Sequence, residues 1–454
     1  MLASETGGVD SVSHPPEGEW PPAGRAWWAL FVFGVTLTIS YVDRGVVNLL
    51  VEPIKADLHL SDTQISLVMG FAFITFYLIL GLPLARVIDG GPRRAILGTC
   101  VTIWSVATGL CGLAQSFFQL ALFRVGVGAG EAGVAPAISS MVSDLFPPHK
   151  LPRAMSMLAF AFIGGNALAL LLGGFVLGSL STSGPLTILG MGPLKPWQLT
   201  FLAVGLPGLF AALLYLTVPD PVRRGGHATA GKDTPTLVEV LRYIRKNASV
   251  FGPMFIGLAL HSVAFFGTLA WSPAFFSRTH GWSPAHYGSV AGIVGLVASP
   301  IGLMIGFRIT ESFIRKGYDD ASLRLVVWAT WLALPFHIAM PLMPNPYLAV
   351  GMIAISGAIG VSAIGSQNAA MMMVTPNRMR GQMTALFLAM YNVIGFGAGP
   401  TVVAVLTDFV FGREALLRWA LLCTALVLPA GSAILLTLGL KPYGEEVARI
   451  RTTA

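Results

Sequence analysis

Residues 117–143 read FFQLALFRVGVGAGEAGVAPAISSMVS, a stretch long enough to cross a membrane in which only Arg124 and Glu131 carry a charge. A helix rises about 1.5 Å per residue, so these two residues lie roughly 10.5 Å apart, and seven residues make nearly two turns, so both project from one face. Each charge costs about 2.5–3.5 kcal/mol at the centre of a bilayer on insertion scales. We therefore predict that this face looks into a watery cavity where a charged species is handled.

The composition is that of a membrane protein. Of the 454 residues, 54% are hydrophobic and 11% are charged, whereas about a quarter of the residues of a soluble domain are charged. The 52 glycines and 30 prolines suit closely packed and locally bent membrane helices. The cysteines Cys100, Cys111 and Cys423 all lie in apolar stretches, so the sequence predicts neither a disulfide framework nor a metal site.

Apolar runs of about 20 residues predict an all-α membrane protein with twelve spans in two six-helix halves. The spans are expected near 27–50, 63–88, 95–114, 117–142, 153–180, 197–219, 249–276, 284–311, 322–342, 346–373, 379–406 and 415–439. The predicted organisation is a disordered N-terminal tail (1–24), an N-terminal bundle (25–219), a cytoplasmic loop (220–248), a C-terminal bundle (249–440) and a C-terminal tail (441–454).

The basic residues predict the orientation of the chain. With both termini in the cytoplasm, only five of the 28 lysines and arginines fall on the outer side, namely Lys55, Lys195, Arg278, Arg413 and Arg418. Arg44 and Arg124 lie within spans, and all the others are assigned to the cytoplasmic side, as the positive-inside rule requires. The net charge of +7 is therefore a topology signal and not a nucleic-acid patch, and we expect a multi-pass protein of the inner cell membrane.

The central loop carries an amphipathic segment. Leu237, Val240, Leu241 and Ile244 share one helical face, with basic residues beside them. We expect a helix lying against the inner leaflet, with a solvated linker helix as the alternative. Two six-span halves around such a loop are the layout of transporters whose binding site lies between the halves.

Span one contains a second pair of charges, Asp43 and Arg44, which point about 100° apart on a helix. One interpretation is that they reach the outer interface by snorkelling. The other is that Asp43 titrates while Arg44 pairs with it or with a ligand. Glu131 has a similar choice, between a structural ion pair with Arg124 and a proton carrier whose protonation responds to hydration and to a nearby arginine.

Two glycine-rich stretches imitate nucleotide-binding motifs. Residues 128–133 spell GxGxxG, but they lie inside an apolar span without a preceding strand. Residues 226–233 resemble a phosphate loop, but Asp233 stands where Ser or Thr would bind magnesium. We therefore expect no nucleotide or other cofactor, and since no nucleophile–base pair appears, no enzyme activity.

The second half has no acidic residue in the middle of a span, so its candidate residues are polar or aromatic. Those expected to line a substrate cavity are His261, Phe265, Trp271, Gln367, Asn368 and Asn392. For His261 and the aromatic residues, ordinary packing is the competing interpretation. An apolar half-site facing a charged half-site suits an amphipathic substrate.

Several stretches of the sequence resemble those of a known family. Residues 85–94, ARVIDGGPRR, are similar to the loop signature GxLADRxGRR of the major facilitator superfamily, keeping Asp89, Arg93 and Arg94 but replacing two other positions with Gly90 and Pro92. More specific runs resemble the Spinster branch of that superfamily across nearly the whole chain. They are YVDRGVVNLLVEPIKADLHLSDTQISLVMGFAF (41–73), FRVGVGAGEAGVAPAISSMVSDLFPP (123–148) and RGQMTALFLAMYNVIGFGAGP (380–400).

The resemblance implies the major facilitator fold and proton-coupled carriage of lysolipids or sphingosine phosphate. Short loops and the absence of an outward Asn-x-Ser/Thr triplet favour a bacterial member. It matches Asp43 and Glu131 to protonation positions, and Arg44 and Arg124 to their charge-partner positions. It also implies that the loop carrying Asp89, Arg93 and Arg94 acts as a gating latch. The glycines of span five, Gly164, Gly165, Gly173 and Gly174, resemble the antiporter motif, although this sequence lacks the proline of that motif.

We therefore expect a monomeric secondary transporter that rocks its halves around a midplane cavity, with protons, membrane lipids and a small amphipathic substrate as partners. Protonation of Glu131 is expected to free Arg124 for an anionic or zwitterionic head group, and Asp43 with Arg44 to couple that event to gating. The alternatives are a drug–proton antiporter, a small organic-anion carrier and, from another class, a passive channel, lipid scramblase or receptor.

Overall fold

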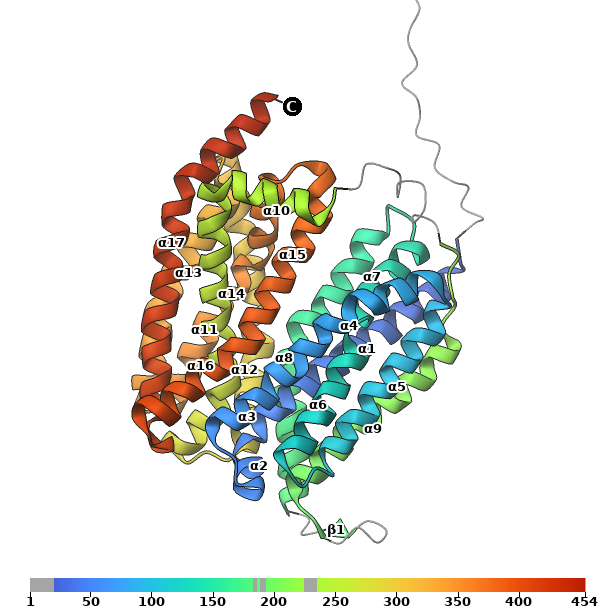
Figure 1. Cartoon of the computed structure of the whole chain (residues 1–454), viewed down its shortest axis with the longest axis vertical. Coiled ribbons are helices and arrows are strands. Elements are labelled where there is room, and N and C mark those ends of the chain that lie inside the picture. The colour runs from blue at the N-terminus through green and yellow to red at the C-terminus, as the bar shows by residue number, and fades with distance from the viewer. Residues whose placement is uncertain (1–19, 183–185, 188–192, 224–234, 454) are drawn as a thin grey trace, which may run out of the picture.

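The computed structural model describes residues 20–182, 186–187, 193–223 and 235–453, and it contains twelve helices that are long and apolar enough to cross a membrane (Figure 1). This confirms the predicted all-α membrane fold. Eight spans are single helices: α1 (Ala23–Leu49), α5 (Arg93–Cys111), α8 (Leu151–Thr182), α9 (Pro196–Leu214), α11 (Ala248–His280), α12 (Pro284–Arg315), α13 (Ala321–Leu342) and α14 (Pro346–Met373). The last span, α17 (Leu417–Thr453), is also one helix.

The other three spans are interrupted. The second consists of α3 (Asp62–Met69) and α4 (Phe71–Gly90), which meet at Gly70, and the fourth of α6 (Phe117–Glu131) and α7 (Val134–Leu145). The eleventh passes through α15 (Arg380–Asn392), the π-helical η4 (Val393–Ala398), α16 (Gly399–Val405) and the π-helical η5 (Leu406–Phe411). Such irregular backbone is tolerated inside a membrane where it is buried in protein or lines a cavity.

Short elements join the spans. They are α2 (Val51–Leu58), α10 (Leu237–Lys246), the 3-10 turns η2 (Tyr215–Thr217), η3 (Asn377–Met379) and η6 (Glu414–Leu416), and an antiparallel pair β1 (Leu186–Thr187) and β2 (Pro193–Leu194). The start of α3 is fixed by a capping box, in which Ser61 and Gln64 satisfy each other's backbone N–H groups.

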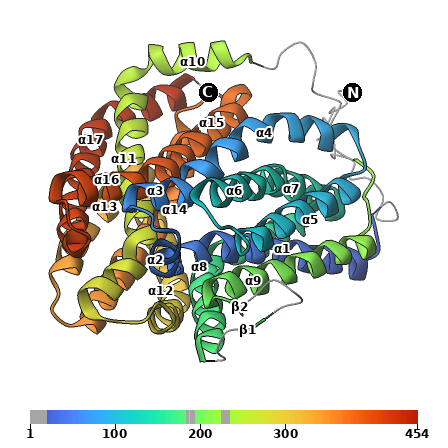
Figure 2. The same ribbon diagram turned by 60° about the horizontal axis from the view of Figure 1, so that its bottom comes forward.

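The spans form two bundles of six, one before and one after the loop that carries α10 (Figure 2). The bundles contact each other through α8 with α12, α3 with α16, and α1 with α11. The end of α17 and α10 lie at one end of the molecule, and α2 and β1 lie at the other (Figure 1). That both termini are cytoplasmic stays a prediction from the charge distribution.

The segments outside the bundles differ in part from expectation. The predicted N-terminal tail lies outside the described residues up to residue 19, and α1 begins at Ala23. The predicted C-terminal tail is helical to Thr453, because Tyr443 and Val447, four residues apart, are buried on one face and extend α17. On α10, Val240 is fully buried in the same cluster, whereas Leu237 and Leu241 are exposed, so the contact of this helix with a membrane surface stays a prediction.

Glycines allow α8 and α12 to approach closely across the two bundles. A Cβ atom at Gly174 would lie 2.9 Å from the carbonyl oxygen of Ala285 and 3.1 Å from the Cα atom of Gly288. A Cβ atom at Gly292 would lie 2.7 Å from the backbone nitrogen of Leu171. Small residues at such positions let membrane helices pack backbone to backbone.

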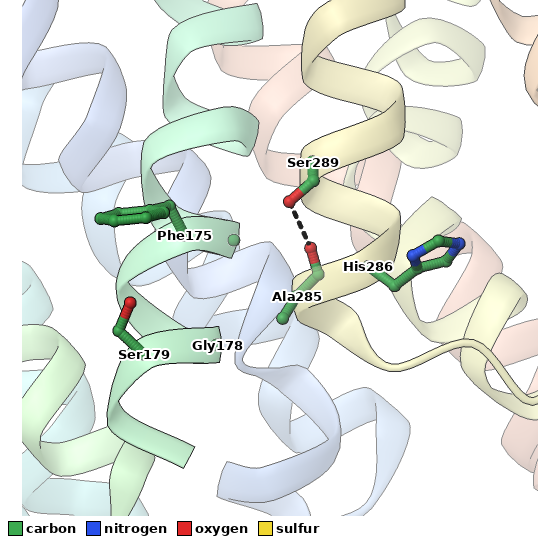
Figure 3. Close-up of a pocket in the computed structure, with 7 residues that line it drawn as sticks. Phe175, Gly178, Ser179, Ala285, His286 and Ser289 are labelled. Carbon is green, nitrogen blue, oxygen red and sulfur yellow. Dashed lines mark hydrogen bonds between the residues drawn. The ribbon is translucent and has the colours of Figure 1, made fainter. Parts of the chain in front are cut away.

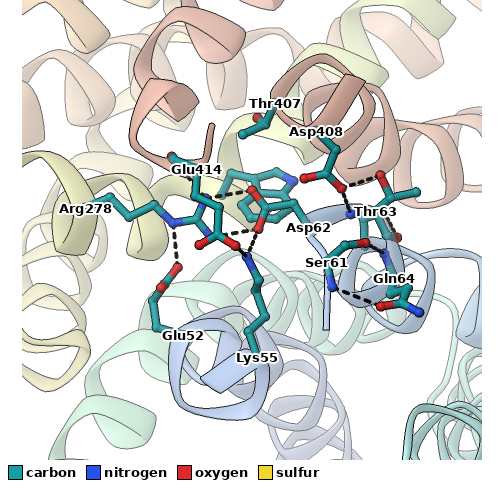
Figure 4. Close-up of polar contacts among 12 residues, drawn as sticks. Glu52, Lys55, Ser61, Asp62, Thr63, Gln64, Arg278, Thr407, Asp408 and Glu414 are labelled. Carbon is teal, nitrogen blue, oxygen red and sulfur yellow. Dashed lines mark hydrogen bonds and ion pairs between the residues drawn. The ribbon is translucent and has the colours of Figure 1, made fainter. Parts of the chain in front are cut away.

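Charged side chains join the bundles at the end that carries α2 (Figure 4). We call Glu52, Lys55, Asp62, Arg278 and Glu414 the α2-end network. Arg278 contacts Glu52 at 2.8 Å and both carboxylate oxygens of Asp62 at 2.7 and 2.8 Å. Lys55 pairs with Asp62 and, at 2.9 Å, with Glu414. Because Glu52, Lys55 and Asp62 belong to the first bundle and Arg278 and Glu414 to the second, the network holds the two bundles together here.

A helix terminus adds to this contact. The carboxylate of Asp408, in η5, accepts hydrogen bonds of 2.7 Å from both the backbone N–H and the hydroxyl of Thr63, at the start of α3 (Figure 4). A carboxylate at a helix N-terminus satisfies an otherwise unpaired N–H group and interacts favourably with the helix dipole. The π-helical segment of the second bundle is thereby tied to the first.

We predict that Gly174→Ala lowers the apparent melting temperature in detergent relative to Gly164→Ala. Both changes gain about 1 kcal/mol of helix propensity, but only at Gly174 does the new methyl group meet backbone atoms of the other bundle, whereas nothing lies within 4 Å at Gly164. Overpacking of this kind costs about 1–3 kcal/mol. Equal melting temperatures for the two variants would show that α8 and α12 are not tightly packed.

We predict that Arg278→Gln loosens the α2 end, because it leaves the fully buried Asp62 with Lys55 alone. The measurement is the rate at which a membrane-impermeant maleimide labels a cysteine placed at Ser66, which is buried on α3 beside Thr401, in a chain whose three cysteines are replaced. We expect roughly tenfold faster labelling, which corresponds to about 1.4 kcal/mol. Arg413→Gln, at an exposed position of the same end, is the control, and equal rates in the two variants would contradict the prediction.

Candidate functional site

A small cavity lies between the two bundles, with about 20 Å³ of room, enough for a water molecule. Its two walls differ in character. The first bundle contributes Arg44, Asn48, Met69, Phe73 and Arg124, and the second contributes Phe266, Leu269, Ala270, Phe396 and Pro400. One wall is therefore cationic and polar, and the other is apolar and largely aromatic.

An ion pair between α1 and α6 stands at the charged wall. The guanidinium of Arg44 donates to one carboxylate oxygen of Glu131, Oε2, from Nε at 2.8 Å and from Nη2 at 2.5 Å. The hydroxyl of Ser40, one turn before Arg44, donates to the same oxygen at 2.7 Å. The side chain of Glu131 is 1% exposed and that of Arg44 is 18% exposed, so the arginine is the partner that reaches the cavity.

The second pair of charges is held differently. The Nη1 atom of Arg124 donates to the backbone carbonyl of Asp43 at 3.5 Å, and the hydroxyl of Thr108 donates to the Asp43 carboxylate at 3.2 Å. Both charged residues are almost completely buried. Arg44, and not Arg124, thus pairs with the Glu131 carboxylate, and Arg124 bonds the main chain of Asp43.

This is a correction of the expected pairing of Glu131 with Arg124 and of Asp43 with Arg44. Residues seven positions apart share a helix face, but roughly 10.5 Å of rise separates them. Adjacent residues on a helix point in different directions. The structure instead pairs Glu131 with Arg44 of the neighbouring helix, and the predicted partners along one helix are wrong.

Three buried atoms of this group have no hydrogen-bond partner within the described part of the chain: Asp43 Oδ1, Arg124 Nε and Glu131 Oε1. Buried polar atoms are normally satisfied, and leaving one unpaired costs about 1–3 kcal/mol. All three belong to the buried charged residues of the site, so an added proton, water molecule or polar ligand would supply the missing hydrogen bonds here.

Aromatic rings surround the two arginines. The guanidinium of Arg44 lies 4.8 Å from the ring centre of Phe73 and 5.5 Å from the ring centres of Tyr41 and Tyr77. That of Arg124 lies 5.5 Å from the same Phe73 ring. These are cation–π distances, and such contacts strengthen where the cation is desolvated.

The six residues predicted for the second half are not among those lining this cavity. Trp271 is fully buried and donates to the carbonyl of Pro400 at 2.8 Å, and Asn392 donates to the carbonyl of Leu388 at 2.8 Å within its own helix. His261 and Phe265 are half-buried on α11, five positions and one position before the lining residue Phe266, respectively. Gln367 is buried and Asn368 half-buried on α14.

The predicted gating loop lies between α4 and α5. Arg93 is buried and binds Asp144 at 2.6 Å, Ser140 at 3.1 Å and the carbonyl of Pro221 at 2.8 Å. Arg94 is exposed, and the side chain of Asp89 lies outside the described residues. The described contacts of Arg93 brace the first bundle internally, and a role for this loop in gating stays a prediction.

A larger surface groove of about 400 Å³ lies between α8 and α12 (Figure 3). Phe175 and Ser179 on α8 and His286 and Ser289 on α12 line it. Unlike the cavity between the bundles, it contains no lysine, arginine, aspartate or glutamate among its lining residues. We therefore take the charged cavity as the candidate functional site.

Residues that the sequence analysis missed complete this site. Ser40 and Asn48 lie one turn before and one turn after Arg44, a polar stripe at four-residue spacing that was available as a signal. Thr108 on α5 and Phe73 on α4 belong to apolar helices and follow no comparable pattern, so only the structure places them beside the charges.

Comparison with known proteins agrees with this architecture. The sequence model of the Major Facilitator Superfamily matches residues 33–400. An MFS-type efflux pump of Mycolicibacterium smegmatis is 32% identical, over 88% of this chain and 90% of that protein. Protein spinster homolog 1 of Xenopus tropicalis is 25% identical, over 84% of this chain and 72% of that protein.

A solved structure is similar over nearly the whole chain. It is the crystal structure of a bacterial homolog of the human lysosomal transporter Spinster in an inward-facing and unoccupied conformation. The TM-score is 0.77 and the identity is 25%, with 94% of this chain and 98% of that chain covered. The protein therefore belongs to the Major Facilitator Superfamily, as a multi-pass membrane transporter that resembles the Spinster proteins.

Proposed function

We propose that the protein is a proton-coupled secondary transporter that moves an amphipathic molecule with an anionic or zwitterionic head group, of the lysolipid or sphingosine-phosphate class, by alternating access. The observation that carries this proposal is the buried Arg44–Glu131 pair at the wall of the cavity between the bundles. Glu131 and an anionic ligand are alternative acceptors for the same guanidinium group.

The two walls of the cavity support an amphipathic substrate. Arg44, Arg124 and Asn48 offer hydrogen-bond donors to a phosphate or carboxylate, and arginine suits both groups because its planar fork matches their geometry. Phe266, Leu269 and Phe396 on the facing wall offer an apolar surface to a hydrocarbon chain. A polar, water-soluble substrate would leave this second wall without a favourable contact.

The arrangement also supports proton coupling. In the present state the carboxylate of Glu131 accepts all its described hydrogen bonds on one oxygen, and the other oxygen is buried and unpartnered. A proton added to this group removes the charge that holds Arg44. The free guanidinium then turns to the head group of the substrate, so that proton and substrate binding favour each other.

Alternating access is supported by the contact between the bundles. The α2-end network closes one end of the molecule, and the similar Spinster homolog was solved in an inward-facing conformation. We infer that the network closes the outer side and that substrate exchanges on the cytoplasmic side in this state. Opening of the network and closure of the opposite end then complete the cycle.

A second candidate is the export of drugs, favoured by the efflux pump that is 32% identical. Cationic drugs would face two arginines at the polar wall, whereas anionic or zwitterionic compounds would not be repelled. A small organic-anion carrier and, from another class, a passive channel, scramblase or receptor are the remaining alternatives. Accumulation against a gradient, abolished by an uncoupler, separates a coupled carrier from that other class.

We predict that Glu131→Gln uncouples transport from protons. The amide keeps the size of the side chain but neither titrates nor holds Arg44 as a carboxylate does, so a ligand gains a charge-assisted contact of about 1.5–3 kcal/mol, or roughly tenfold to hundredfold in affinity. The measurement is uptake of a fluorescent lysophospholipid into proteoliposomes with and without an imposed proton gradient. The variant is expected to give the same rate in both conditions.

The control for this experiment is Glu239→Gln, which neutralises an exposed carboxylate on α10, outside the spans. It is expected to keep the gradient dependence of the wild type. If Glu131→Gln keeps that dependence as well, Glu131 is not the proton site and the proposed coupling is wrong.

We predict that lysophospholipids raise the apparent melting temperature of the purified protein, since a ligand that binds only the folded state stabilises it by mass action. The screen includes single-chain lipids with phosphate head groups, cationic dyes and sugar acids, and Phe266→Ser serves as a variant with a less apolar wall. The lipid effect is expected to weaken in Phe266→Ser. Stabilisation by dyes alone would support drug export, and stabilisation by sugar acids alone would support an organic-anion carrier.

A further inference from the structure

Phe73 lies where three parts of the site meet. It is in the first turn of α4, its side chain is almost completely buried, and it lines the cavity between the bundles. Its ring centre is 4.8 Å from the guanidinium of Arg44 and 5.5 Å from that of Arg124. One aromatic ring thus contacts both cations, although they belong to different charge pairs.

The backbone around Phe73 is fixed on two sides. A Cβ atom at Gly128 of α6 would lie 3.1 Å from the carbonyl carbon and 3.3 Å from the Cα atom of Phe73, so α6 packs directly on its main chain. One turn earlier, a Cβ atom at Gly70 would lie 3.1 Å from the carbonyl oxygen of Gly397 and 3.3 Å from the carbonyl carbon of Phe396, in the other bundle. Phe73 therefore lies within one helical turn of a close backbone contact between the two bundles.

The charged and titratable groups near this ring come from four helices. They are Tyr41, Asp43 and Arg44 on α1, Tyr77 on α4, Cys111 on α5, and Arg124 and Glu131 on α6. From the second bundle, the apolar side chains of Phe266, Leu269 and Phe396 line the same cavity. Apart from Glu131, the Arg44 guanidinium has described contacts with three aromatic rings, and the ring of Phe73, at 4.8 Å, is nearer than those of Tyr41 and Tyr77, at 5.5 Å.

We propose that Phe73 is a positioning residue that fixes the guanidinium groups of Arg44 and Arg124 relative to each other and transmits their movement to the Gly70–Phe396 contact between the bundles. This inference rests on the proposed function, because it assigns Phe73 a part in the coupling of proton and substrate. The ring attracts both guanidinium groups through its negative face. Its electrostatic character, and not only its volume, then determines how readily Arg44 leaves Glu131.

The test replaces Phe73 with mono-, di- and trifluorophenylalanine, which keep nearly the size of the ring and progressively weaken its negative face. The measurement is the pH at which lysophospholipid uptake into proteoliposomes is half-maximal, together with the ratio of uptake with and without a proton gradient. We expect the pH midpoint to shift stepwise in one direction along the fluorine series. Phe73→Leu, which has no ring, is expected to lower gradient-driven uptake about tenfold.

Phe76→Leu is the matched control, since Phe76 lies on the same helix with an exposed ring, and it is expected to behave like the wild type. An unchanged pH midpoint along the fluorine series would overturn the inference, even if Phe73→Leu is inactive, because loss of packing alone explains that result. Glu131→Gln is measured beside these variants. If it loses gradient dependence while the fluorine series has no effect, the proposed function stands and only the role of Phe73 is wrong.

Discussion

The buried pair of Arg44 and Glu131 constrains the rest of this structure. Three donors converge on one oxygen of Glu131, so the carboxylate is stabilised in one orientation while its other oxygen stays unpartnered. Breaking a buried ion pair by removing one partner costs about 3–5 kcal/mol, because the remaining charge is left uncompensated. The pair therefore does not open spontaneously to any large extent. In the proposed mechanism it opens when a proton neutralises Glu131 or when another anion takes its place, and this requirement would link the two events.

The irregular segments of the backbone lie around this pair. The fourth span is interrupted directly after Glu131, the second at Gly70, and the eleventh in η4, which brings Phe396 to the cavity. Single π-helical turns occur frequently at functional sites, and non-helical backbone within a membrane requires a buried or hydrated surrounding. The close approach of Gly70 to η4 places two of these interruptions against each other across the bundles. The spans are therefore least regular where the proposed rocking movement would have to be accommodated.

Hydropathy and the cost of a buried charge were sufficient to predict the twelve spans and to single out Asp43, Arg44, Arg124 and Glu131, which the structure brings to one region. They were not sufficient for the pairing, because partners on neighbouring helices leave no spacing rule in the sequence. In the second half, the search for polar residues selected His261, Gln367 and Asn392, whereas the described cavity wall is apolar. A phenylalanine in an apolar span looks the same in the sequence whether its ring is exposed, as that of Phe76 is, or lies against two arginines, as that of Phe73 does.

The α2-end network and the central Arg44–Glu131 pair differ in their position relative to the two bundles. Lys55, Asp62 and Arg278 lie at the end of the spans, so opening that end returns them to water, and rehydration offsets much of the lost Coulomb attraction. Arg44 and Glu131 both belong to the first bundle, with Glu131 in the middle of the fourth span, and separating them leaves buried charges without a partner unless a ligand or proton intervenes. In the proposed transport cycle, the α2-end network therefore sets the balance between conformations, which modest changes shift. In that cycle the central pair instead determines which bound species allow the conformations to exchange, because it lies within one bundle whereas the network lies between the two.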